Sequence, residues 1–287
     1  MIEGVTEKDI ESISKLYQKA ETEILDAIAN SDPTKTASKR KLLRQIRQQL
    51  QDLEQPTLEF MEEKTLAEYK SGIKEVDDAL EDVNLEGGFD VVDSRAPAFI
   101  ISNADAILED ARMELESVLS NSYLNIQKVI SQTTQDVQRE LLSQIAQGQI
   151  LGTARQKIRE RVVGTLLNRG ITGFTALDAK GNARNYSLKA TAERLVRQTI
   201  MNGRDSAVLS KSIEKGSDLV KVSEHSGESP MCQKYSGQIV SISGTSDEYP
   251  SLSSIMFSGD YTRGGGIRHP YCRHTLIPYI PTKIKFN

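Results

Sequence analysis

Apolar residues in the first part of the chain recur at steps of three and four residues, which is the period of an amphipathic helix. The first such stripe ends at Ser31-Asp32-Pro33, and the second lies on a strongly basic segment. Pro56 suits the first turn of a third helix, and Gly87-Gly88 interrupts the pattern. The pattern therefore predicts three helices before a connector, over residues 9–29, 42–53 and 56–80, with the connector at 88–101.

The longest segment without Gly or Pro runs from Phe99 to Gln147. One apolar face continues along it, with Ser122 as its weak point, and Ser102 with Asp105 resembles a capping box. About 40 helical residues would extend roughly 60 Å, more than the width of a small domain. One interpretation is a stalk or interaction arm. The other, which we favour, is an ordinary bundle with a kink in this helix.

The second half of the chain alternates helices with short strands. A helix over residues 153–168 ends at Gly170, a hairpin occupies 171–188, and a helix over 189–215 ends before Gly216. Short strands and turns follow to residue 287. The sequence thus predicts an α+β protein: a helical arm or bundle at 1–150 and a small mixed domain at 151–287.

Charge is unevenly distributed along the chain, although the net charge is only −4. Residues 51–150 hold 7 basic and 21 acidic side chains, whereas residues 151–287 hold 20 basic and 11 acidic. We interpret the acidic block as the solvated surface of long helices. The basic half fits either such a surface or contact with nucleic acid. The chain has no apolar run long enough for a membrane helix and no signal-like start, and with only two cysteines we expect a soluble intracellular protein.

All three histidines and both cysteines fall in one 50-residue window: His225, Cys232, His269, Cys272 and His274. Thiolate and imidazole groups are the ligands that zinc prefers, and Cys272 and His274 would point to one side of a strand. We predict a structural zinc site of His225, Cys232, Cys272 and His274, with His269 in reserve. The alternative is that Cys232 is a small buried hydrophobe and His269 a turn residue.

The sequence signals for other kinds of functional site are weaker than the signal for a metal site. The chain has no Gly-x-Ser-x-Gly elbow, no His-Glu-x-x-His pair and no Walker loop around Gly264-Gly265-Gly266, so we assign no catalytic residue. Arg194, Arg197 and Arg204 lie on the predicted helix 189–215, where Arg197 and Arg204 share a face. These arginines are our candidates for phosphate contact, and the alternative is a solvated helix edge.

Several stretches of the second half resemble one protein family. They are Ala192-Glu-Arg-Leu-Val-Arg-Gln-Thr-Ile, residues 216–241, the hairpin beginning at Gly173, Tyr249-Pro-Ser-Leu, and His269-Pro-Tyr-Cys-Arg-His-Thr-Leu-Ile-Pro-Tyr. Together they resemble the minor capsid proteins of tailed phages, related to the Mu F-like head-morphogenesis group, over residues 150–282. Tyr235 stands where we expect the family to carry Trp. Cys232 stands where many members carry His, and cysteine at this position is also a side chain that can bind a metal.

The resemblance implies a minor component inside the phage head near the portal, acting in head morphogenesis and in DNA packaging or ejection. The partners would be the portal protein, other capsid or scaffold proteins and packaged DNA, with no membrane; the protein would be in host cytoplasm during assembly. Two alternatives stay open. One is a nuclease-like or toxin-like hydrolase with His225 or His274 as general base, and the other is a host cytoplasmic adaptor.

Overall fold

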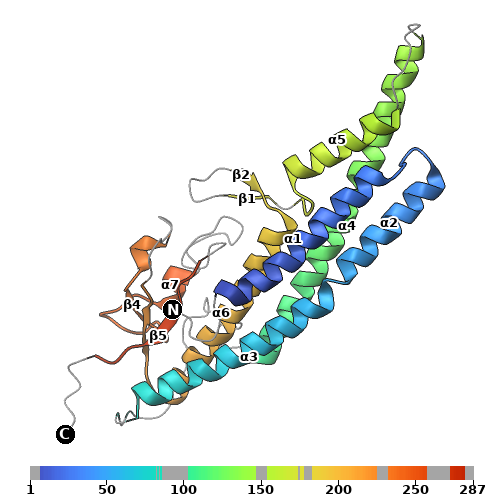
Figure 1. Cartoon of the computed structure of the whole chain (residues 1–287). Helices are drawn as coiled ribbons and strands as arrows, with labels where there is room; N and C mark the ends of the chain where they lie inside the picture. The colour runs from blue at the N-terminus through green and yellow to red at the C-terminus, as the bar shows by residue number, and fades with distance from the viewer. Residues whose placement is uncertain are drawn as a thin grey trace.

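The computed structural model describes residues 7–81, 83, 85, 103–146, 154–173, 175–177, 183–224, 232–256 and 272–281. Six long helices dominate the molecule (Figure 1): α1 Glu7–Asn30, α2 Thr36–Gln51, α3 Glu54–Ala79, α4 Ala104–Ala146, α5 Ala154–Arg169 and α6 Leu188–Glu214. The three helices predicted before residue 81 are confirmed, with boundaries shifted by a few residues. Among the described helices, none combines the length and apolarity that crossing a bilayer requires.

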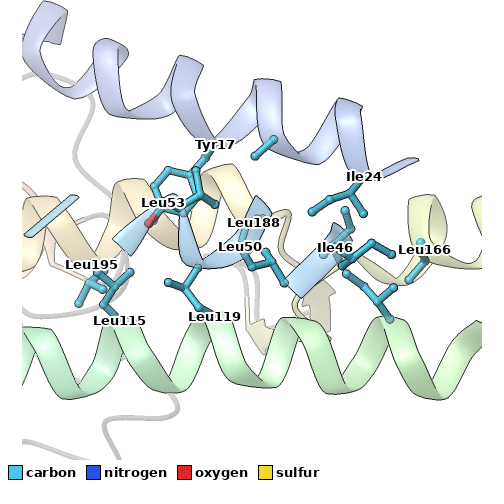
Figure 2. Close-up of a cluster of buried hydrophobic side chains, with 14 of the residues drawn as sticks. Tyr17, Ile24, Ile46, Leu50, Leu53, Leu115, Leu119, Leu166, Leu188 and Leu195 are labelled. Atoms are coloured by element: carbon cyan, nitrogen blue, oxygen red, sulfur yellow. The ribbon is translucent and has the colours of Figure 1, made fainter. Parts of the chain in front are cut away.

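The larger hydrophobic core lies between these six helices. Figure 2 shows side chains of α1, α2, α4, α5 and α6 converging there, among them Tyr17, Ile46, Leu115, Leu166 and Leu195, each at most 2% exposed. The stripes read from the sequence are the faces that meet in this core. Because α5 and the first half of α6 contribute to it, this core contains residues from both sides of the domain boundary predicted at residue 150.

Helix α4 is a single uninterrupted α-helix of 43 residues, about 65 Å long. Ser122, the weak point of the predicted apolar face, is buried, and its hydroxyl donates to the Val118 carbonyl at 2.7 Å, which lets the polar residue lie inside the apolar stripe. The side chain of Asn103, the residue before the helix, accepts the Ala106 N–H at 2.9 Å, whereas Ser102 of the predicted capping box lies outside the described residues. Its far end extends beyond α1 and α2 in Figure 1, beside α5.

The C-terminal part contains two small antiparallel sheets, as the α+β prediction requires. Strands β1 (Thr175–Leu177) and β2 (Ala183–Asn185) form the expected hairpin. A second sheet has the order β4-β3-β5, from Ile239–Ser241, Leu219–Val222 and Leu276–Pro278. A smaller core joins this sheet and α7 (Leu252–Met256) to the ends of α3 and α6. The sheet is therefore anchored on the helical bundle.

Helices α3 and α6 approach each other closely, and this contact positions the sheet. A Cβ atom added at Gly203 would lie 2.5 Å from Thr65 Cγ2, so a larger residue does not fit there. Beside it, Arg204 of α6 forms ion pairs with Glu68 and Glu75 of α3. Glu68 is fully buried and Arg204 is 8% exposed, which makes this ionic cluster part of the interior.

Candidate metal centre

Two segments that lie 40 residues apart in the sequence meet at one end of the β4-β3-β5 sheet. Cys232 immediately precedes a short 3-10 turn, Gln233–Tyr235, on the connection from β3 to β4. Cys272 and His274 lie on the segment that leads into β5. Because β3 pairs with both β4 and β5, the two segments are brought side by side. The structure thus brings Cys232 together with Cys272 and His274, as predicted.

The three side chains converge on one buried point. Cys232, Cys272 and His274 are 1%, 3% and 0% exposed, and their ligand atoms all lie within 4.8 Å of one another. Cys272 Sγ is 3.5 Å from His274 Nδ1. Zinc bonds of roughly 2.3 Å to sulfur and 2.0–2.1 Å to nitrogen would put tetrahedral ligand atoms about 3.6 Å apart. The donor set therefore fits a zinc ion, provided that the widest pair of ligand atoms, up to 4.8 Å apart, closes by as much as about 1 Å.

The alternative to a metal site is that both cysteines are buried, metal-free side chains. A hydrogen bond between thiol and imidazole explains the Cys272–His274 distance. Cys232 reaches the same point from a different segment of the chain. Neither cysteine forms a disulfide, so no such bond explains their proximity.

Backbone hydrogen bonds hold the Cys272–His274 segment from two sides. Ser223 and Thr275 exchange bonds, with the Ser223 N–H donating to the Thr275 carbonyl at 2.8 Å and the Thr275 N–H donating to Ser223 Oγ at 2.9 Å. The Leu276 N–H donates to Asp205 Oδ1 of α6 at 3.0 Å. The backbone that directly follows His274 is thus held both to Ser223, next to β3, and to α6 of the bundle.

His225 and His269 lie outside the described residues, as does the Gly-rich stretch 258–266. The predicted fourth ligand is therefore untested.

The alternative of a hydrolase assigned His274 the role of a general base. A general base must reach a substrate proton, and His274 is fully buried with Nδ1 against Cys272, so this side chain does not suit that role.

The three arginines predicted to contact phosphates have different surroundings. Arg194 donates to Glu114 Oε1 at 2.5 Å and to Gln198 Oε1 at 2.7 Å. Arg204 is buried in the cluster with Glu68 and Glu75, so the alternative of a solvated edge is wrong for it. Arg197 is half-buried and borders a surface groove, together with Arg273.

Sequence reasoning missed the residues that position the site, Asp205 and Ser223, and it also missed the buried acid Glu68. A signal for Glu68 was present, because it falls in register with the buried residues Met61, Thr65, Gly72 and Val76 of α3. No comparable signal marks Asp205, because its partner lies 71 residues away.

Comparison with known proteins identifies one family. The family model described as phage minor capsid protein 2 matches residues 5–284, which is nearly the whole chain. No curated protein and no solved structure matches.

Proposed function

The chain belongs to the phage minor capsid protein 2 family and is thus a phage capsid protein, and from this premise we propose that it works inside the head, near the portal. There it would act in head morphogenesis and in DNA packaging or ejection. Its partners would be the portal protein and other capsid or scaffold proteins. The observation that carries the proposal is the family match over residues 5–284, which includes the helical half as well as the metal cluster.

The helical architecture supports a docking role. Helices α4 and α5 form a projecting pair, tied together where Lys157 and Arg161 bond to Glu140 at 2.6 and 2.8 Å. Exposed apolar side chains occur on both helices, with Leu142 of α4 and Leu167 of α5 each 66% exposed. A stiff helical pair whose end extends beyond α1 and α2 suits contact with another head protein (Figure 1).

Zinc would have a structural role in this function. Cys232, Cys272 and His274 would hold the ion, with His225 as the fourth ligand and His269 in reserve. The ion would cross-link the segment before β4 to the segment before β5, in a domain whose strands are only three or four residues long.

Cross-linking of intact heads tests the location directly. A photoreactive group at Leu142, and a control group at Lys19 on α1, would be introduced into assembled heads and analysed by mass spectrometry. We expect cross-links from Leu142 to the portal or another internal head protein, and protection of the chain from external protease until the heads are opened. Digestion in sealed heads would contradict an interior location.

A further inference from the structure

A groove of about 370 Å³ lies between α1 and α6, beside the metal cluster. It is bordered by Glu11 and Ser14 of α1, by Lys189, Glu193 and Arg197 of α6, and by Arg273. The three α6 residues are spaced four apart and therefore share one face of that helix. Arg273 comes from the segment that also carries Cys272 and His274. The groove thus collects three cations from two distant parts of the sequence.

We propose that this groove binds the phosphate backbone of DNA through Lys189, Arg197 and Arg273, an inference that rests on the proposed role in DNA packaging or ejection. Arginine suits phosphate because its planar guanidinium presents paired donors to two oxygens. Four of the lining residues come from the half of the chain after residue 150, which holds 20 basic and 11 acidic side chains, and such a charge balance favours approach of a polyanion. The recognised chemistry is the phosphodiester and not the base, so binding is independent of sequence.

Two carboxylates make this a site for weak, salt-sensitive binding. Glu11 and Glu193 also border the groove, which leaves an excess of one positive charge among its lining residues, and Glu21 of α1 lies near Lys189. Glu11 is paired with Lys15 at 2.9 Å, on the exposed side of α1. Glu193 lies between Lys189 and Arg197 on the same helix face and would repel a phosphate. Removing the charge of Glu193 should therefore strengthen binding, a signed outcome that a general loss of structure does not produce.

The metal cluster presents Arg273 to the groove. Residues 272 and 274 point into the protein and are 3% and 0% exposed, so the intervening Arg273 points to the surface, where it is exposed. An ion held by Cys272 and His274 would fix the backbone on both sides of Arg273. This coupling rests on the proposed zinc site, whereas the groove itself does not.

The test is binding of the full chain to a fluorescent duplex DNA of about 30 base pairs, at two salt concentrations and with two unrelated sequences. We expect R197A and R273A each to weaken binding roughly three- to tenfold and to reduce the slope of log affinity against log salt by about one. E193Q should tighten binding. R139A is the matched control, because Arg139 is an exposed arginine of α4 paired with Asp136 at 3.3 Å. Thermal melts verify that each variant is folded.

The outcomes separate the groove from the metal site. Affinities of R197A and R273A equal to that of R139A would overturn the groove, whatever the zinc content. A polyglutamate of equal charge that binds more tightly than the DNA would overturn the nucleic-acid assignment. Chelation should weaken binding by the native chain to the level of R273A and leave R273A unchanged. If chelation removes bound zinc without altering affinity, the coupling is wrong and the groove stands.

Discussion

Replacing Arg204 with methionine tests whether this side chain belongs to the fold or to a nucleic-acid surface. Arg204 is 8% exposed, and its Nη1 lies 3.5 Å from Oε2 of Glu68, which is fully buried. Methionine keeps much of the aliphatic volume but removes the cation that faces Glu68. Truncating one partner of a buried ion pair typically lowers the free energy of unfolding by about 3–5 kcal/mol. Glu75 contributes less to this loss, because 29% of its side chain is exposed.

The assay is urea unfolding followed by circular dichroism at 222 nm, with R194M as the matched control. Arg194 lies on the same helix and pairs with Glu114, which is 45% exposed, so we expect a loss of about 1 kcal/mol or less. The double variant E68Q/R204M has neither charge at this pair and should be more stable than R204M alone. Folded R204M should bind DNA as the native chain does. A stability of R204M within about 0.5 kcal/mol of the native value would refute the reasoning, as would a double variant no more stable than R204M.

Three further predictions follow from the packing. Burial raises the pKa of Tyr17 from 10.0 to about 12, so unfolded tyrosine ionises first and stability should fall by about 2–3 kcal/mol between pH 10 and pH 12. Y17F should abolish that loss, and at neutral pH it should lower the free energy of unfolding by about 1 kcal/mol because the hydrogen bond to Thr57 is lost. The same change of urea midpoint with pH in the native chain and in Y17F would contradict this. G203A should destabilise the α3–α6 contact by about 1–3 kcal/mol and be rescued by T65S, whereas G164A, with open space around its Cβ, should unfold at equal or higher urea concentration. D205A should weaken zinc binding about 10–100-fold in a competition titration, while D205N keeps an acceptor for the Leu276 N–H; equal loss in both variants would disprove a positioning role.

Much of the secondary structure was predictable, because burial of one helix face leaves a period in the sequence. The ends of α5 and α6 were marked by Gly170 and Gly216, whose φ angles of 75° and 76° favour glycine. The packing partners were not predictable, because a stripe indicates that a face is buried without indicating what covers it. For this reason the core that crosses residue 150 was missed.

The site was predictable in its chemistry but not in its surroundings. Cys232, Cys272 and His274 could be paired because few residue types bind zinc and all occurrences fall in one window. The roles of Arg194 and Arg204 could not be read in the same way, because their carboxylate partners Glu114 and Glu75 lie 80 and 129 residues away. A helical arginine has the same local sequence whether it faces solvent or a buried acid.

Metal content of the full-length protein, measured together with its melting in the presence and absence of a chelator, tests the central claim most directly. The account predicts about one zinc per chain, lost in C232S and in C272S. Chelation should unfold the β4-β3-β5 sheet, whose core includes both cysteines, and largely preserve the helical signal, because the bundle core contains none of the ligands. A metal-free protein that melts identically with and without chelator would contradict the account.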